Sequence, residues 1–249
     1  MNTTIQKTFA LVGKNISYSF SRDYFSKKWE QLGILDTEYI HFDIENISEL
    51  PIQIQKTSTL KGMNVTIPYK EQIIPFLNFL DKTAELIGAV NTIKILPDGM
   101  LKGYNTDYYG FMKSLYPLLK FSHKKALVLG TGGAAKAITF ALQKMGIEFL
   151  LVSREAKENQ INYSEITKEI LEEYTIIVNC TPVGTFPNTS FCPSIPYNFL
   201  DKRHLLYDLI YNPEKTTFLA KGEAQGATIC NGYQMLVYQA EAAWKIWNE

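Results

Sequence analysis

A short apolar strand that ends in a glycine-rich turn is the feature that most constrains this chain. Residues 127–129 (LVL) are followed by GTGGAA and then by a helical pattern over 136–146. Glycines at this spacing permit a tight turn and a close backbone approach, and the unpaired amides at a helix N-terminus favour an anion. The sequence therefore predicts a dinucleotide-binding turn whose cofactor contacts are Gly130, Thr131, Gly132, Gly133 and Ala134. A glycine-rich loop that merely turns the chain is the simpler alternative, whereas a Walker loop is excluded because no Gly-Lys-Ser/Thr follows.

The next expected strand indicates which dinucleotide is bound. It ends in Ser153-Arg154, and Arg154 lies 154 − 130 = 24 residues after the first glycine. The side chain that reads the adenosine ribose stands at about this distance, and an acid there selects NAD. A hydroxyl and a planar cation instead suit a 2′-phosphate, so the pattern predicts NADP. Two alternatives stay open: Glu155 could pair with Arg154 or bind the ribose hydroxyls, and Arg154 could be a solvated surface charge.

Two series of alternating strands and helices surround this turn. Before it, the pattern predicts strands at 9–12, 39–44 and 62–67 and helices at 23–32 and 70–80. Asp98-Gly99 predicts a tight turn that joins 90–96 and 100–104 as an antiparallel hairpin. A helix is expected at 108–119, then strands at 126–130, 149–153, 176–180, 205–210 and 227–230, and a last helix at 233–247. The fold class is therefore α/β, with a mixed-sheet unit followed by a Rossmann-type unit.

Composition excludes several classes of function. Lys plus Arg and Asp plus Glu both number 25, so no net field draws nucleic acid or anionic lipid to the protein. No apolar run approaches the roughly 20 residues of a membrane helix, so we expect a soluble, cytoplasmic protein with no membrane partner. The three cysteines form no Cys-x-x-Cys pair and have no histidine at ligand spacing, so neither a disulfide framework nor a metal site is expected.

Polar residues gather where the strands of the first series end, which is where α/β folds place functional side chains. In NVTIPYK (64–70), strand alternation puts Asn64 and Thr66 on one face. Pro68 then ends the strand and delivers Lys70 to the start of the expected helix, where a cation opposes the helix dipole. That mismatch suggests a chemical use for Lys70, although a single lysine is more often simply solvent-exposed.

Seven segments in a fixed order resemble the shikimate dehydrogenase family along nearly the whole chain. They are SYSFS (17–21), NVTIPYK (64–70), GAVNT (88–92), NTD (105–107), GTGGA (130–134), DLIYNP (208–213) and GYQMLVYQA (232–240). One departure falls at the first segment, where the family usually reads His-Ser-x-Ser-Pro and this chain reads Tyr18-Ser19-Phe20-Ser21-Arg22. The resemblance implies reversible NADPH-dependent reduction of 3-dehydroshikimate to shikimate, a step of chorismate and aromatic amino acid biosynthesis.

The resemblance also implies a set of site residues. Lys70 and Asp107 would form the catalytic pair, in which an ammonium can donate a proton to the alkoxide that hydride transfer creates. Substrate contacts would come from Ser19, Ser21, Asn64, Thr66, Asn91, Tyr211 and Gln239, the two serines holding the carboxylate and facing the same way if extended. Gly232, Met235 and Thr181 would join Ser153 and Arg154 at the cofactor.

Because Gln239 lies in the last helix, the C-terminus is expected to return to the first domain. The expected domains are thus 1–106 plus 232–249 for substrate and 107–231 for NADP. We expect small-molecule partners and a monomer or homodimer. A quinate/shikimate dehydrogenase using NAD or NADP is the nearest alternative, and a nucleotide-sensing module that lost turnover is a distant one.

Overall fold

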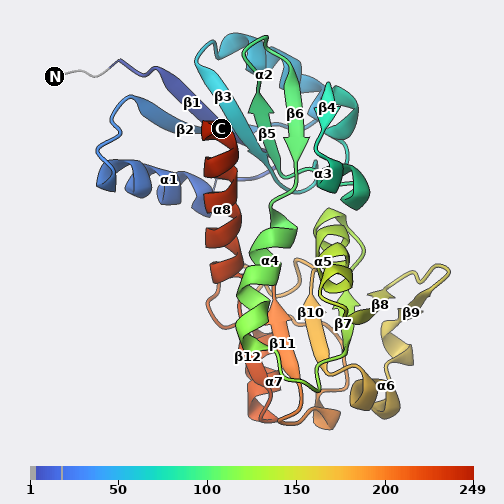
Figure 1. The fold of residues 1–249 in the computed structure, drawn as a ribbon. Coiled ribbons are helices and arrows are strands. Elements are labelled where there is room, and N and C mark those ends of the chain that lie inside the picture. Colours follow the sequence, from blue (N-terminus) through green and yellow to red (C-terminus); the bar gives the residue numbers. More distant parts are fainter. Residues whose placement is uncertain (1–3, 18) are drawn as a thin grey trace. The chain divides into compact units, whose positions relative to one another are not determined.

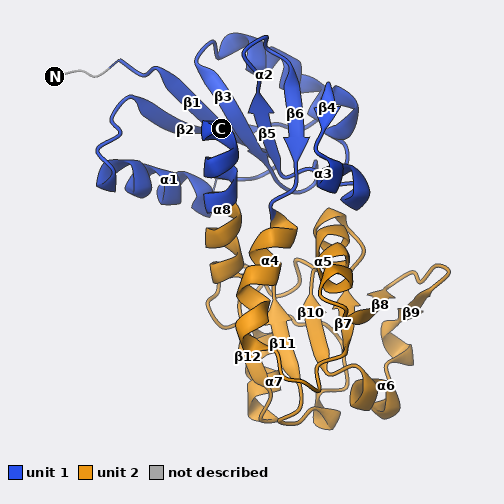
Figure 2. Ribbon diagram, viewed as in Figure 1, with its two compact units in different colours: residues 1–106, 240–249 blue, residues 107–239 orange. Residues whose placement is uncertain are grey.

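The computed structural model describes residues 4–17 and 19–249; Tyr18, part of the serine-containing segment, lies outside the described residues. The chain divides into two units, one of residues 1–106 with 240–249 and the other of residues 107–239 (Figure 2). The chain thus returns to unit 1 at Ala240, compared with the expected return at residue 232. No helix within the described ranges is long and apolar enough to cross a membrane.

Unit 1 is built on a mixed sheet of six strands in the order β2-β1-β3-β5-β6-β4 (Figure 1). Strands β2, β1 and β3 run parallel, while β5 pairs antiparallel with both β3 and β6. The expected hairpin is therefore confirmed. The strands are β1 (Lys7–Gly13), β2 (Thr37–Asp43), β3 (Leu60–Val65), β4 (Phe79–Leu80), β5 (Thr92–Ile95) and β6 (Leu101–Tyr104). The helices are α1 (Phe20–Gln31), η1 (Ile47–Glu49), α2 (Leu50–Lys56), η2 (Ile74–Phe76) and α3 (Lys82–Ile87), together with the end of α8 (Tyr233–Asn248).

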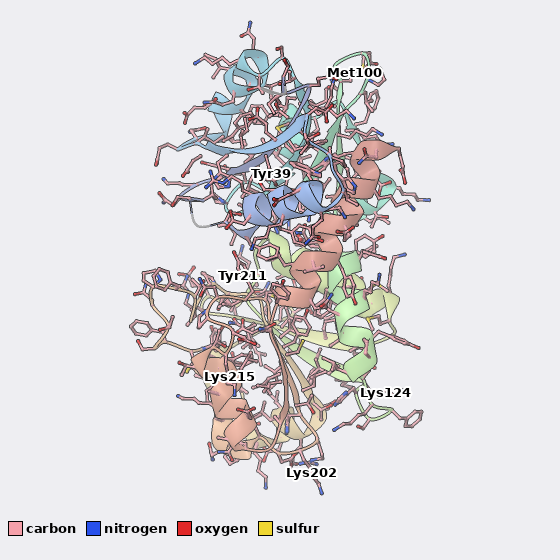
Figure 3. The ribbon with its side chains drawn as sticks, turned by 90° about the vertical axis from the view of Figure 1, so that its left-hand side faces the viewer. Tyr39, Met100, Lys124, Lys202, Tyr211 and Lys215 are labelled. Atoms are coloured by element: carbon pink, nitrogen blue, oxygen red, sulfur yellow. The ribbon has the colours of Figure 1, made fainter. Side chains whose placement is uncertain are left out.

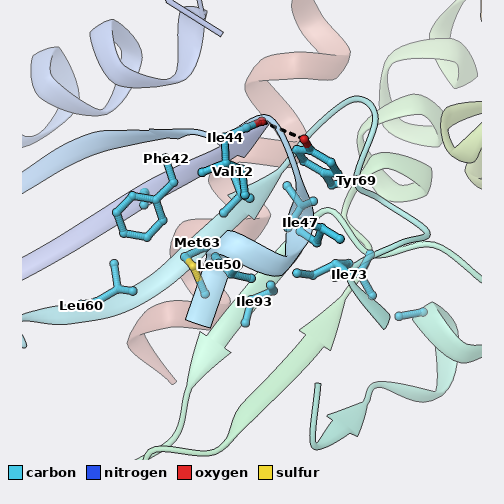
Figure 4. Packing of buried hydrophobic residues seen from close by; sticks show 14 residues of the cluster. Val12, Phe42, Ile44, Ile47, Leu50, Leu60, Met63, Tyr69, Ile73 and Ile93 are labelled. Atoms are coloured by element: carbon cyan, nitrogen blue, oxygen red, sulfur yellow. Dashed lines mark hydrogen bonds between the residues drawn. The ribbon is translucent and has the colours of Figure 1, made fainter. Parts of the chain in front are cut away.

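Apolar side chains cover both faces of this sheet, which explains why β1 reads as a continuous apolar run. One cluster contains Val12, Leu50 and Met63, and in it the buried Tyr69 hydroxyl donates to the Ile44 carbonyl (Figure 4). The cluster on α1 and α8 is aromatic, with Phe9, Phe25, Trp29, Tyr39 and Trp247 among its members. The Trp247 indole donates to the Ile93 carbonyl over 2.9 Å, which fixes the end of α8 against the sheet.

The helix expected at 70–80 is absent. Residues 67–73 form turns, and only the 3-10 helix η2 at Ile74–Phe76 follows. Pro75 explains the difference, because proline lacks an amide donor and its ring clashes with the preceding turn of an α-helix. Lys70 therefore lies in a turn and not at a helix N-terminus, so no helix dipole acts on it.

Unit 2 is built on six parallel strands in the order β12-β11-β10-β7-β8-β9. Read from β9, this is the strand order of a doubly wound dinucleotide-binding fold, with its reversal between β7 and β10. The strands are β7 (Lys125–Leu129), β8 (Glu148–Ser153), β9 (Gln160–Asn162), β10 (Ile176–Asn179), β11 (Leu205–Asp208) and β12 (Thr228–Cys230). The helices are α4 (Asp107–Leu115), η3 (Tyr116–Leu118), α5 (Gly133–Lys144), η4 (Tyr163–Glu165), α6 (Lys168–Glu173), η5 (Tyr197–Phe199), α7 (Thr217–Ala224) and the first part of α8.

The central strands of this second sheet are apolar on both faces, so β10 and residues 126–129 of β7 are buried between two hydrophobic clusters. Helices α4 and α5 supply Phe111, Ile138 and Leu142 to one cluster, and α7 supplies Phe218 to the other. The helix expected at 108–119 stops at Leu115 and continues as η3, since Pro117 cannot extend an α-helix.

Candidate active site

The turn after β7 has the backbone geometry that a dinucleotide-binding loop requires. Gly130 has a φ of +105°, a conformation that residues with a side chain rarely adopt. Its amide donates to the Val152 carbonyl over 2.9 Å, which holds the turn against β8. A Cβ at this position would lie 3.0 Å from the Thr181 methyl group, so the turn and the loop after β10 are in close contact.

Helix α5 begins at this turn and presents an anion site. Gly132 is its N-cap and makes no side-chain cap, so the first backbone amides have no partner from a capping side chain. A Cβ on Gly132 would meet no atom within 4 Å, so there is open space over the helix end. Thr131 is exposed, while Gly133 and Ala134 are partly buried. A diphosphate fits this arrangement, because the amides and the helix dipole both favour negative charge.

Ser153 ends β8, and Arg154 follows it at the same edge of the sheet as Gly130. Arg154 is exposed, and among the residues that the structure describes it forms no ion pair with Glu155. The Glu155 amide instead donates to the Ser153 hydroxyl oxygen over 3.3 Å, which leaves the Ser153 proton available. A hydroxyl and a guanidinium therefore stand where a 2′-phosphate would be read, and the residues fit NADP.

A buried polar network joins the ends of β10 and β11. The Asn179 side-chain oxygen accepts from the Thr181 amide over 3.0 Å and from the Thr181 hydroxyl over 2.7 Å. The Asn179 amide group donates to Asp208 Oδ1 over 3.0 Å, and the Thr216 hydroxyl donates to Asp208 Oδ2 over 2.6 Å. Burial raises the pKa of Asp208 to about 6, because these donors only partly replace water. This network fixes Thr181, one of the expected cofactor residues.

The remaining expected residues of unit 2 lie after β11 and on α8. Tyr211 follows β11 and is partly exposed, and the Gly232 amide donates to the Ile210 carbonyl over 3.0 Å. Met235 is buried in the cluster of α4 and α5. Gln239 is buried, and its amide group donates to the Leu236 carbonyl within α8 over 3.0 Å.

Ser19 and Ser21 lie at the start of α1, so the two serines are not on one extended segment. Ser19 is the N-cap, and its hydroxyl oxygen accepts from the Ser21 amide over 3.3 Å. Ser21 is in the first turn and is buried. Two hydroxyls at a helix N-terminus still suit a carboxylate, because both the hydroxyl protons and the helix dipole attract it.

Asn64 and Asn91 are brought together at the carboxyl end of β3. Asn64 Nδ2 lies 3.3 Å from the Asn91 carbonyl and 3.3 Å from Thr92 Oγ1. Asn91 Oδ1 accepts from the Thr106 amide over 2.7 Å, and Asn91 Nδ2 donates to the Thr106 hydroxyl over 2.9 Å. All four side chains are buried. The cluster is a fixed group of donors and acceptors of the kind that recognises a polyol.

Lys70 and Thr66 follow Asn64 on the segment after β3. The Lys70 carbonyl accepts from the Val90 amide over 2.7 Å, so Lys70 is held beside the segment that carries Asn91. Thr66 is partly exposed, and its methyl group packs against Gly13. Asp107 begins α4 in unit 2, one residue after Thr106, and it is buried. Within the described chain, no group of three metal-ligating side chains lies close enough to hold a metal ion.

Sequence reasoning missed Tyr39, which is labelled in Figure 3. Its hydroxyl donates to Asn64 Oδ1 over 2.8 Å. It also missed the roles of Asn179, Asp208 and Thr216. Asp208 stood inside a recognised segment, and an acid at the end of an apolar strand was the signal that could have found it. Tyr39 offered no comparable signal, because an aromatic residue in a strand is ordinary core composition.

Comparisons with known proteins identify the family of the chain. Residues 11–93 match the family model described as the shikimate dehydrogenase substrate binding domain. The chain is 36% identical over 255 residues to a shikimate dehydrogenase (NADP(+)) of Methanosphaera stadtmanae, covering 95% of this chain and 89% of the relative. The chain belongs to the shikimate dehydrogenase family.

Solved structures of shikimate dehydrogenases share its fold. The enzyme of Peptoclostridium difficile has a TM-score of 0.86 at 38% identity, covering 97% of this chain and 92% of that one. The enzyme of Thermus thermophilus, solved in complex with NADP(H) and shikimate, has a TM-score of 0.85 at 30% identity, covering 97% and 93%. The expected family and the expected fold class are both confirmed.

Proposed function

We propose that this shikimate dehydrogenase homologue reduces 3-dehydroshikimate reversibly to shikimate with NADPH. The observation that carries the proposal is its similarity, along nearly the whole chain, to enzymes named for shikimate and NADP(+). The site residues support it, since they supply an anion site at α5, a hydroxyl pair at α1 and a buried polyol-binding cluster. The enzyme would serve chorismate-forming biosynthesis in the cytoplasm, with small molecules as its partners.

In this proposal, Lys70 and Asp107 carry the proton chemistry. When bound at this site, NADPH would supply the hydride for the carbonyl carbon, and the carbonyl oxygen of the substrate would become an alkoxide. The Lys70 ammonium donates the proton that completes the hydroxyl group, and Asp107 orients the lysine and accepts a hydrogen bond from a substrate hydroxyl. In the oxidative direction the same pair removes the proton.

The other side chains bind and orient the substrate. Ser19 and Ser21 hold its carboxylate at the N-terminus of α1, a position at which hydroxyl protons and the helix dipole act together. Asn64, Thr66 and Asn91 contact ring hydroxyls, with Tyr211 and Gln239 as further contacts. The domain assignment of 1–106 plus 232–249 for substrate and 107–231 for cofactor belongs to this proposal.

Arg154 and Ser153 support NADP as the preferred cofactor. Both stand after β8, and Arg154 is exposed and so able to meet a phosphate. Gly130 to Ala134 hold the diphosphate, Thr181 contacts the cofactor from the loop after β10, and Gly232 and Met235 border the nicotinamide.

A matrix of two substrates and two cofactors tests the proposal. The wild-type protein is assayed in the oxidative direction with shikimate or quinate, each with NADP⁺ or NAD⁺, by the absorbance of the reduced cofactor. We expect the highest kcat/KM with shikimate and NADP⁺. Equal kcat/KM for quinate would favour a quinate/shikimate dehydrogenase, and cofactor binding without any turnover would favour a sensing module.

A further inference from the structure

Tyr39 lies in the centre of β2, where its ring is packed among the aromatic residues of unit 1. It stacks on Phe25 of α1, with ring centroids 5.1 Å apart and an angle of 14° between the planes. Trp29 lies on the same side at 6.3 Å. Only 4% of Tyr39 is exposed. The ring is thus fixed by packing, and its hydroxyl has little freedom to choose partners.

The Tyr39 hydroxyl bonds to a residue that the proposed function assigns to substrate. Its proton goes to Asn64 Oδ1 over 2.8 Å. Burial raises the pKa of Tyr39, so the hydroxyl keeps its proton and remains the donor to Asn64.

Among the residues that the structure describes, three hydrogen bonds hold the Asn64 side chain, and the bond from Tyr39 is the shortest. The other two join Asn64 Nδ2 to the Asn91 carbonyl and to Thr92 Oγ1, and both measure 3.3 Å. These two use the amide protons, whereas Tyr39 uses one lone pair of Oδ1. The second lone pair of Oδ1 is left to accept from a hydroxyl group of a ligand. Asn64 therefore presents an acceptor in a fixed direction.

We propose that Tyr39 is a positioning residue for the substrate, acting through Asn64. This inference rests on the proposed function, because it assumes that Asn64 contacts a substrate hydroxyl. Without the Tyr39 hydroxyl, Asn64 Oδ1 loses the 2.8 Å bond, and the amide can turn about its side-chain torsion. The substrate then has to immobilise the amide itself, and this weakens binding of the substrate but not of the cofactor.

Tyr39→Phe tests the inference with little change in packing, since the stacked ring remains. We expect the KM for 3-dehydroshikimate to rise about fivefold, the effect of losing about one net hydrogen bond. The KM for NADPH should stay unchanged. Tyr207→Phe is the matched control, because the Tyr207 hydroxyl is also fully buried and bonds to the Ser114 hydroxyl over 2.6 Å. This control should lower stability without raising the KM for 3-dehydroshikimate.

A double-mutant cycle identifies the route of the effect. If Tyr39 acts through Asn64, then Tyr39→Phe should not raise the KM further in a chain that already carries Asn64→Ala. An additional fivefold rise in that background would overturn the route, as would an equal rise in the KM for NADPH.

The outcomes for the wild type and for the variant are distinguishable. A wild type that does not turn over 3-dehydroshikimate overturns the proposed function and the inference with it. An active wild type with an unchanged KM in Tyr39→Phe overturns the inference alone.

Discussion

Asp208 is a buried carboxyl group whose protonation should change the stability of unit 2. None of its surface is exposed, and burial raises its pKa to about 6 from an ordinary value of 3.8. The folded state therefore binds the proton more tightly than the unfolded state does. The stabilisation is complete below the pKa that Asp208 has in the unfolded state. It is lost as the pH rises through the pKa of Asp208 in the folded state.

The size of this effect follows from the difference in pKa. A shift of about two pH units corresponds to roughly 3 kcal/mol over the whole titration. About 2 kcal/mol of it should be lost between about pH 4.5 and about pH 8. Asp208→Asn removes the titrating group and keeps the amide oxygen as an acceptor for Asn179 and for the Ile210 amide. The unfolding free energy of the variant minus that of the wild type should therefore rise by about 2 kcal/mol over this range.

Urea denaturation followed by far-ultraviolet circular dichroism measures the difference. Tryptophan fluorescence is less suitable, because Trp29, Trp244 and Trp247 all belong to unit 1. In Thr216→Val, the unfolding free energy should decrease more with rising pH than it does in the wild type. The reason is that the Thr216 hydroxyl stabilises the charged carboxylate of Asp208. If the difference in unfolding free energy between Asp208→Asn and the wild type does not change with pH, the titration of Asp208 does not contribute to stability.

Three further predictions concern the cofactor site and the last helix. Arg154→Ala should raise the KM for NADPH much more than the KM for NADH, and equal changes in steady-state kinetics would remove its role at the 2′-phosphate. Gly130→Ala should lower the unfolding free energy by about 1–3 kcal/mol and raise the KM for NADPH, because its φ is +105° and Thr181 is close; unchanged values of both would contradict this. Glu241→Gln should cost about 0.5–1 kcal/mol in urea denaturation, because Lys28 bonds to both carboxylate oxygens over 2.6 Å; a Glu241→Gln variant as stable as the wild type would show that this ion pair contributes nothing.

The features predictable from the sequence are those that short segments determine. The strand, turn and helix around Gly130 were predictable because glycine spacing, an apolar run and a helical pattern lie within about twenty residues. The hairpin at Asp98-Gly99 was predictable for the same reason. The helix expected at 70–80 does not form, because Pro75 interrupts the apolar periodicity on which that expectation rests.

The features that were missed depend on contacts between distant parts of the chain. Tyr39 and Asn64 are 25 residues apart, and Asn179 and Asp208 are 29 apart. Parallel pairing of β10 with β11 brings Asn179 and Asp208 together, whereas Tyr39 and Asn64 lie on β2 and β3, which both pair with β1. No local pattern records which residue faces which. Ser19 shows the intermediate case, since serine is a favoured N-cap and the start of α1 could have been placed there.

The central claim is that the protein moves hydride from NADPH to 3-dehydroshikimate with Lys70 as the proton donor. The most direct measurement is NADPH consumption with 3-dehydroshikimate by the wild type and by Lys70→Ala, with NADPH binding measured separately for both. We predict turnover by the wild type and a loss of kcat of at least about a hundredfold in Lys70→Ala, with unchanged NADPH binding. No turnover by the wild type, or full activity in Lys70→Ala, would contradict the claim.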